Sequence, residues 1–224
     1  MRDHFGNNLL SSDLNFARGI HILDDCEGTC NWKKSANDAN ATVSYETIAA
    51  WTGTKGLQLF SGDATPQAGD IVNAYKIFSY PETGLLVIRA KVGMPDISDI
   101  EYIGFSLIIN NGTRQYTLLF LYAPASGKVY YTSSNGTLQE ITELKQNVVD
   151  DIYTGLELII DLNTMTYVSA MFNGLEKNMA GVSFYNAGAN TNKYVQIGFY
   201  TTNIGVDPVT SYWDCIYVGE YVNV

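Results

Sequence analysis

The sequence predicts an all-β protein made of two stacked antiparallel sheets. About thirteen short segments alternate apolar and polar residues or run as brief apolar stretches, and turn-forming residues separate them. The pairs Asn111-Gly112 and Asn135-Gly136 are strong hairpin signals, because Asn and Gly both accept a positive φ. No repeat or change of composition divides the 224 residues. We therefore expect residues 19–224 to form a single β-sandwich domain, preceded by an extended arm over residues 1–18.

Each expected strand is bounded by turn formers such as Gly, Asn, Asp or Pro. The nearly continuous apolar run 85–92 predicts a buried central strand. Segment 28–40 is polar and rich in turn formers, and segment 175–192 is expected to be irregular. Apolar residues spaced three and four apart leave a short helix near 138–149 as an alternative to a strand and a loop. In chain order, the expected strands are 20–25, 41–48, 55–61, 70–79, 85–92, 102–110, 115–122, 128–132, 137–141, 153–161, 165–172, 194–202 and 211–220.

The last expected strand, 211–220, resembles the first in composition. Both are short apolar strands that carry acidic residues and one Cys, so we expect them to pair side by side and close the domain. A strict period of two over the last strand places alternate side chains on opposite faces. The predicted faces are Tyr212, Asp214, Ile216 and Val218 on one side, and Trp213, Cys215, Tyr217 and Gly219 on the other.

Charge and hydropathy exclude several classes of partner. Thirteen Lys and Arg against 23 Asp and Glu give a net charge of −10, which repels phosphate backbones, so no nucleic acid is expected. No stretch approaches 18 apolar residues, so no membrane insertion is expected. The N-terminus lacks the apolar core of a secretory signal, and we therefore expect synthesis in the cytoplasm.

The three cysteines are Cys26, Cys30 and Cys215. An odd number without a secretory signal favours a reducing compartment during synthesis, although the sequence does not decide whether any two of them pair. A metal site formed by the three thiols and His21 can be drawn, but the spacing differs from the usual zinc knuckle. Buried free thiols that pack as small apolar groups are the preferred interpretation.

Several of these segments together resemble the concanavalin A-like (laminin-G-like) jelly-roll domains of lectins and glucanases. The resemblance is carried by Leu23-Asp-Asp-Cys-Glu27, the following Trp32, the apolar run 85–91 and the closing strand Trp213-Asp-Cys-Ile-Tyr-Val218. It covers residues 20–222 and implies a two-sheet jelly roll whose first and last strands are neighbours. The opening segment, from Arg2 to Leu10, is similar in style to the arms that begin many small phage virion proteins.

The sequence contains few of the residue patterns that catalytic sites require. Glycosidases need two carboxylates that face each other across a cleft, and Glu157 with Asp161 comes nearest, since both share one face of a strand. Their positions at the ends of an apolar strand favour solvent-facing structural roles instead. The chain has no G-x-S-x-G elbow and only two His. We therefore expect a protein that is not an enzyme.

Two kinds of ligand remain open. Pairing of the terminal strands would gather Asp24, Asp25, Glu27 and Asp214, which predicts either a calcium site or carboxylates that cap turns. The second interpretation is preferred, so no cofactor is expected, with calcium as the alternative. Exposed aromatic rings stack on sugars, and Trp51, Tyr130 and Tyr131 are candidates for glycan or partner contacts, whereas Trp32 and Trp213 are expected in the core. Tyr130 and Tyr131 point to opposite faces of a strand, so one of them belongs to the core.

The functional hypothesis is a non-enzymatic virion surface or structural protein of the capsid-decoration or fibre type, located on the virion surface. It would act through protein–protein contacts as part of an assembly, with host glycans as additional partners. A carbohydrate-binding module outside any virion is the alternative, and a glycoside hydrolase or lyase is third. The arm would dock onto the viral shell or a sister subunit through Arg2, His4, Phe5, Leu9 and Leu10.

Overall fold

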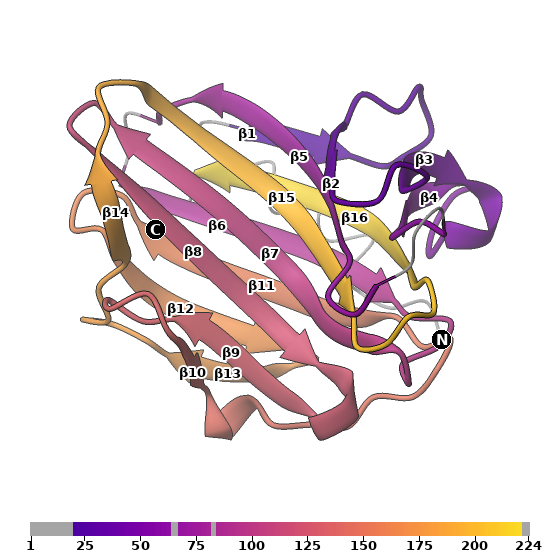
Figure 1. The fold of residues 1–224 in the computed structure, drawn as a ribbon. Helices are drawn as coiled ribbons and strands as arrows, with labels where there is room; N and C mark the ends of the chain where they lie inside the picture. Colours follow the sequence, from indigo (N-terminus) through magenta and orange to yellow (C-terminus); the bar gives the residue numbers. More distant parts are fainter. Residues whose placement is uncertain (1–19, 64–66, 82–83, 221–224) are drawn as a thin grey trace.

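The computed structural model describes residues 20–63, 67–81 and 84–220, which form two antiparallel sheets packed face to face (Figure 1). The arm residues Arg2, His4, Phe5, Leu9 and Leu10 lie outside these ranges. In chain order, the strands are β1 (Ile20–Asp24), β2 (Lys33–Ala36), β3 (Thr42–Glu46), β4 (Gly56–Phe60), β5 (Ile71–Ser79), β6 (Leu85–Gly93), β7 (Ile100–Asn111), β8 (Arg114–Ala123), β9 (Lys128–Thr132), β10 (Leu138–Glu140), β11 (Thr154–Asp161), β12 (Thr166–Phe172), β13 (Leu175–Asn178), β14 (Tyr185–Ala189), β15 (Lys193–Asn203) and β16 (Thr210–Glu220).

Each sheet has eight strands. One, here called the β16 sheet, has the order β13-β12-β11-β6-β16-β4-β3, with β1 also paired to β16. The other, the β15 sheet, has the order β10-β9-β8-β7-β15-β5-β2, with β14 also paired to β8, and it is the nearer sheet in Figure 1. This arrangement confirms the predicted two-sheet antiparallel sandwich. The described residues contain no helix long and apolar enough to cross a membrane.

The core lies between the two sheets and is rich in aromatic rings. The ring centroids of Phe199 and Trp213 are 4.6 Å apart, and Phe105 is 6.2 Å from the same indole. Trp32 packs 5.0 Å from Phe199. Trp32 is 7% exposed and Trp213 is fully buried, so the prediction that both tryptophans belong to the core is confirmed.

The predicted pairing of the first and last strands is confirmed. β1 runs antiparallel to β16, with Leu23 opposite Tyr217 and Asp24 opposite Ile216. The predicted alternation within β16, however, is wrong beyond Asp214. The register with β6 shifts between Asp214 and Tyr217, and Cys215 has a φ of 52°. This bulge restarts the alternation, so that Trp213 and Ile216 both enter the core.

Strands in the interior of a sheet were predicted correctly, whereas three strands that pair with one neighbour were missed. The apolar run 85–92 is the interior strand β6, and the Asn111-Gly112 hairpin joins β7 to β8 as expected, with Gly112 at a φ of 93°. Segments in which no strand was expected contain β2, β13 and β14, each of which pairs with one neighbouring strand only. The segment near 138–149 holds β10 and a single 3-10 turn, η4 (Thr142–Leu144), rather than a helix of several turns.

Candidate functional site

The three aromatic residues predicted to bind a ligand do not lie together. Trp51 is 37% exposed and lies on the outer side of the β16 sheet, where its ring is 5.1 Å from that of Tyr153. Tyr131 points into the sandwich and contacts Tyr167 at 5.4 Å. Tyr130 points the other way, out of the β15 sheet, against Tyr102. The prediction that only one of the paired tyrosines joins the core is therefore confirmed, and Trp51 and Tyr130 lie on opposite outer faces.

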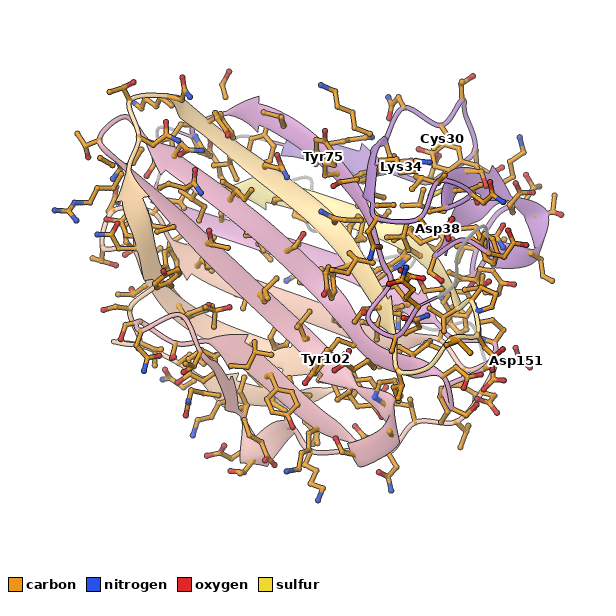
Figure 2. All side chains as sticks on the ribbon, in the orientation of Figure 1. Cys30, Lys34, Asp38, Tyr75, Tyr102 and Asp151 are labelled. Carbon is orange, nitrogen blue, oxygen red and sulfur yellow. The ribbon has the colours of Figure 1, made fainter. Side chains whose placement is uncertain are left out.

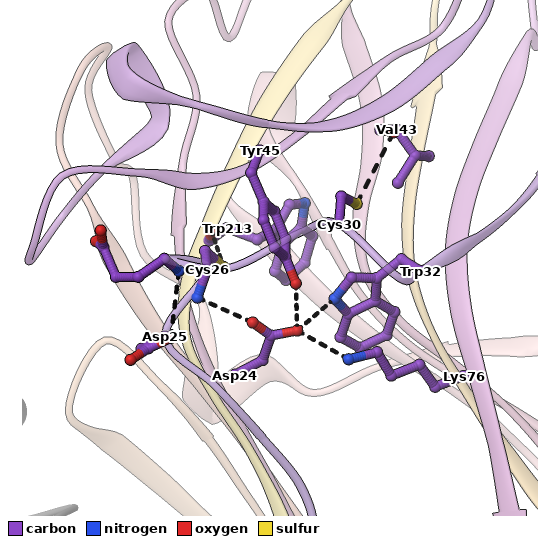
Figure 3. Close-up of polar contacts among 10 residues, drawn as sticks. Asp24, Asp25, Cys26, Cys30, Trp32, Val43, Tyr45, Lys76 and Trp213 are labelled. Atoms are coloured by element: carbon purple, nitrogen blue, oxygen red, sulfur yellow. Dashed lines mark hydrogen bonds and ion pairs between the residues drawn. The ribbon is translucent and has the colours of Figure 1, made fainter.

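The carboxylates of the acidic cluster predicted for the paired terminal strands accept hydrogen bonds from groups within the protein. Asp24 is 9% exposed, and its carboxylate accepts hydrogen bonds from Tyr45 Oη at 2.6 Å and Lys76 Nζ at 2.8 Å (Figure 3). The indole Nε1 of Trp32 donates to the same carboxylate at 2.8 Å, as does the backbone N–H of Cys26 at 2.9 Å. Its oxygens are thus used by donors within the protein.

The remaining carboxylates of that cluster cap turns. Asp25 accepts from the backbone N–H of Glu27, and Glu27 accepts from the backbone N–H groups of Thr54 and Lys55. Hydrogen bonds from Thr54 keep the pKa of Glu27 below its usual value. Asp214, fully buried, accepts from three backbone N–H groups, including those of residues 51 and 52 at 2.8 Å each. Within the described ranges, no group of three or more His, Cys, Asp or Glu is arranged to hold a metal ion.

The three cysteines are free thiols in the structure. Cys26 is buried, and its Sγ is 3.9 Å from the carbonyl oxygen of Trp213. Cys30 Sγ lies 4.0 Å from the carbonyl oxygen of Val43, and Cys215 Sγ lies 3.4 Å from a hydroxyl group. Burial is the main cause of a raised pKa at each thiol, which favours the neutral form. These contacts agree with the interpretation as packed thiols; the side chain of His21 is not among the described ones.

The carboxylate pair considered for glycoside hydrolysis has structural contacts. Glu157 is largely buried and forms an ion pair with Arg89 on the neighbouring strand β6. Asp161 accepts hydrogen bonds from the backbone N–H of Asn163 and the hydroxyl of Thr164, in the turn between β11 and β12. Glu157 alternates with the core residues Leu156 and Leu158, so its side chain points out of the sandwich, where the ion pair with Arg89 leaves it only partly exposed.

The outer face of the β15 sheet carries a group of tyrosines, of which the sequence analysis singled out only Tyr130. The residues that alternate with them, such as Phe105 and Phe199, are fully buried in the core, so the tyrosines point out of the sandwich. Figure 2 shows Tyr75 and Tyr102 on this nearer sheet. We call this surface the tyrosine face; it comprises Tyr75 on β5, Tyr200 on β15, Tyr102 on β7 and Tyr130 on β9, all partly exposed.

Strand register brings these tyrosines together. Tyr200 stands opposite Asn73 on one side and Gly104 on the other, and Gly198 stands between Tyr75 and Ser106. The rings of Tyr102 and Tyr130 meet edge to face, with centroids 6.0 Å apart. Gly198 and Gly104 are both buried, because neighbouring atoms fill the space that a side chain would take at each position.

Polar groups complete the tyrosine face. The Ser106 hydroxyl lies 3.1 Å from Asn73 Oδ1, a hydrogen bond that crosses above Gly198. Burial, followed by the nearby carboxylate of Glu101, raises the pKa of both Tyr102 and Tyr200, so these phenols stay protonated at neutral pH. A protonated phenol both donates and accepts hydrogen bonds. The face therefore offers aromatic edges and planes together with neutral hydroxyl and amide groups.

No protein-family model matches the sequence, and no curated protein matches it. The structure is similar to that of the cellulose-induced protein Cip1, with a TM-score of 0.58 and 15% identity over 89% of this chain and 97% of that one. It is also similar to the carbohydrate recognition domain of Emp46p, with a TM-score of 0.53 and 10% identity over 91% of this chain and 94% of that one. A carbohydrate esterase from the Shiga toxin-encoding bacteriophage phi24B gives a TM-score of 0.53 and 11% identity over 85% and 90%, respectively.

At these identities the likeness concerns the fold alone. The chain is a β-sandwich protein whose fold is shared with carbohydrate-recognition and carbohydrate-active proteins. The neighbours do not establish membership of the concanavalin A-like family in particular. They also do not establish a virion role, since the phage protein among them is an esterase by its own description.

Proposed function

We propose that this chain is a carbohydrate-binding β-sandwich protein that contacts a glycan through the tyrosine face. The observation that carries the proposal is the register that sets four partly exposed tyrosines on one outer face of the β15 sheet. Tyr200 lies diagonally between Tyr75 and Tyr102, and the ring of Tyr102 contacts that of Tyr130. The apolar face of a pyranose ring packs on aromatic rings, and its hydroxyl groups pair with phenols and amides. Strands β5 to β9 span four inter-strand steps, or roughly 19 Å, which suits an oligosaccharide rather than one sugar.

Binding, rather than hydrolysis, is supported by the carboxylates that border the tyrosine face. Glu140 on β10 forms a 2.8 Å ion pair with Lys128, and Glu101 lies on β7. Three inter-strand steps separate these two strands, roughly 14 Å, which exceeds the about 5–9.5 Å between the two carboxyl groups of glycosidases. We therefore retain the non-enzymatic interpretation as part of the proposal.

The virion hypothesis keeps the status of a prediction. It depends on the arm over residues 1–18, which lies outside the described residues, and the structural neighbours give it no support. The tyrosine face, in contrast, supports the alternative that the sequence offered, a carbohydrate-binding module. The glycan-contact role predicted for Tyr130 is kept in this proposal, and the roles predicted for Trp51 and Tyr131 are not.

A glycan array followed by calorimetric titration of the best ligand tests the proposal. Tyr102→Ala and Tyr200→Ala should each weaken binding about tenfold, because each removes one ring from the contact surface. Trp51→Ala is the matched control, since it removes an exposed aromatic ring from the opposite sheet. Thermal unfolding of each variant checks that the fold survives. If no glycan on the array is retained, or if only the Trp51 variant loses binding, the proposal fails.

A further inference from the structure

A pocket lies at the β2 end of the tyrosine face. β2 pairs only with residues 72–75 of β5, so the second half of β5 extends beyond it. Next to this free edge is a pocket of about 340 Å³. Tyr75, a member of the tyrosine face, forms part of its wall, so a glycan lying across the face would reach the pocket with one end. The other residues that line it include Asn31, Lys33, Lys76, Ile22 and Phe78.

Two lysine ammonium groups line the pocket, and only one of them is paired with a carboxylate of the described residues. Lys76 Nζ is committed to Asp24 at 2.8 Å and lies 4.4 Å from the centre of the Trp32 ring. Lys33 is exposed and stands directly opposite Tyr75 across the β2–β5 pair. Within the part of the chain that the structure describes, Lys33 has no carboxylate partner, since the ion pairs there use other cations. One uncompensated positive charge therefore borders the pocket.

We propose that this pocket binds the carboxylate of an acidic sugar unit, with Lys33 as the cation and Asn31 as an additional donor. The inference rests on the proposed function and adds the class of sugar. An ammonium group pairs with a carboxylate through a charge-assisted hydrogen bond.

The charge of the rest of the molecule restricts the ligand further. The chain carries a net charge of −10, and Glu101 lies near Tyr102 and Tyr200, away from the β2 edge. A uniformly anionic polymer along the whole face would be repelled there. The arrangement suits a glycan with a uronic acid at the β2 end and neutral units over Tyr200 and Tyr102.

Paired glycans that differ only in charge test this inference. The array should present oligosaccharides with a single terminal uronic acid beside their neutral counterparts, such as cellobiouronate beside cellobiose, within a broad set of neutral oligosaccharides. We expect the wild-type protein to prefer the acidic member of a pair about tenfold. Lys33→Gln should abolish that preference. Lys145→Gln is the matched control, because it removes the same charge at an exposed position after η4, beyond the opposite edge of the β15 sheet.

The outcomes separate this inference from the proposed function. Equal binding of acidic and neutral members, or an acidic preference that survives Lys33→Gln, overturns the inference while Tyr102→Ala still tests the glycan site. Failure to retain any glycan, acidic or neutral, overturns the proposed function and the inference with it. A preference that is lost in Lys33→Gln, is kept in Lys145→Gln and weakens as salt is raised from about 0.05 M to about 0.5 M supports the inference.

Discussion

The indole Nε1 of Trp32 lies 2.8 Å from Oδ2 of Asp24, and the same oxygen accepts hydrogen bonds from Tyr45 and Lys76 (Figure 3). Asp24 belongs to β1 in the β16 sheet, whereas Lys76 belongs to β5 in the β15 sheet. A single carboxylate thus joins the two sheets and fixes the indole that packs on Phe199. The resemblance-bearing Asp and Trp of the early sequence are therefore structural partners.

Replacement of Asp24 by Asn should destabilise the fold. The amide keeps one acceptor oxygen but loses the charge, so Lys76 would remain partly buried without its partner. Breaking such a pair costs about 3 kcal/mol of unfolding free energy, which urea unfolding would measure. Asp25→Asn is the matched control, because Asp25 is exposed and accepts one backbone hydrogen bond at 3.2 Å. Equal effects of the two substitutions would contradict the bridging role.

Low pH should reduce the contribution of Asp24 to the stability of the fold. Burial favours its neutral form, but hydrogen bonds from Lys76, Tyr45 and the backbone of Cys26 together outweigh burial and lower its pKa. A pKa that is lower in the folded than in the unfolded state stabilises the fold above the unfolded pKa of about 3.9, and this stabilisation is lost as the pH falls through the folded pKa. The stability difference between wild type and Asp24→Asn should therefore shrink below about pH 4.

The contribution of Asp214 to stability changes with pH in the opposite direction, so the experiment must distinguish it from that of Asp24. Its pKa is raised, chiefly by burial, against the effect of the three backbone N–H groups that bind it. Its contribution to stability is present below the unfolded pKa and is lost as the pH rises through the folded pKa. Comparison of Asp24→Asn with wild type at each pH cancels this effect, since both proteins contain Asp214. A stability difference that stays constant from about pH 6 to about pH 2 would contradict the prediction for Asp24.

The parts of the fold that the sequence predicts are those that local pattern determines. Alternation and Asn-Gly turns are local, and they identify β6 and the β7–β8 hairpin. The bulge at Cys215 is not local. It depends on Asp214 binding the backbone of residues 51 and 52, more than 160 positions away in the chain. The sequence pattern also fails to reveal the exposed, polar strands β2 and β14. Each is held in place by hydrogen bonds to one neighbouring strand, and neither has an alternating pattern of large apolar residues.

The tyrosine face illustrates the same limit for a site. Alternation alone places Tyr75 outward on β5 and Tyr200 outward on β15. Their juxtaposition, however, requires that β15 insert between β5 and β7, which are close in sequence. Nothing in the local pattern indicates that insertion. The isolated Trp51, in contrast, is conspicuous in the sequence and packs far from these rings, on the other sheet.

Two glycines of the tyrosine face should respond differently to Ala. A Cβ at Gly104 would lie 2.0 Å from the carbonyl oxygen of Phe120, a backbone atom that cannot move without disturbing the sheet. A Cβ at Gly198 would lie 2.2 Å from Asn73 Oδ1 and 2.6 Å from Ser106 Oγ, which are side-chain atoms able to rotate away. Gly104→Ala should cost about 3 kcal/mol of unfolding free energy, and Gly198→Ala less than about 1 kcal/mol.

Glycan titration completes the comparison of the two glycines. Gly198→Ala should keep the fold yet weaken glycan binding. The added methyl group would displace the side chains of Ser106 and Asn73, break the hydrogen bond between them and so change the surface of the tyrosine face. Normal affinity in a folded Gly198→Ala protein would count against this face as the glycan site. A fully stable Gly104→Ala protein would contradict the close approach of β7 and β8 at that position.

Asn110 is expected to be a site where the natural residue lowers stability. It lies on β7 between Tyr194 and Gln115, it is fully buried, and neither its side-chain oxygen nor its side-chain nitrogen has a hydrogen-bond partner. A buried amide without partners carries a desolvation penalty of about 1–3 kcal/mol. Asn110→Leu keeps the branching at Cγ and removes that penalty, so urea unfolding should show a gain of about 1 kcal/mol or more.

The adjacent residue supplies the control for Asn110. Asn111 Oδ1 accepts hydrogen bonds from the backbone N–H groups of Thr113 and Arg114, at 3.0 and 2.9 Å, in the turn between β7 and β8. Asn111→Leu should therefore lose about 1–2 kcal/mol, although it changes the same chemical groups one position away. A loss of stability in Asn110→Leu comparable to that in Asn111→Leu would show that the buried amide is paired in solution. We expect Asn110→Leu to raise the free energy of unfolding and Asn111→Leu to lower it, because only the amide of residue 111 has hydrogen-bond partners within the described part of the chain.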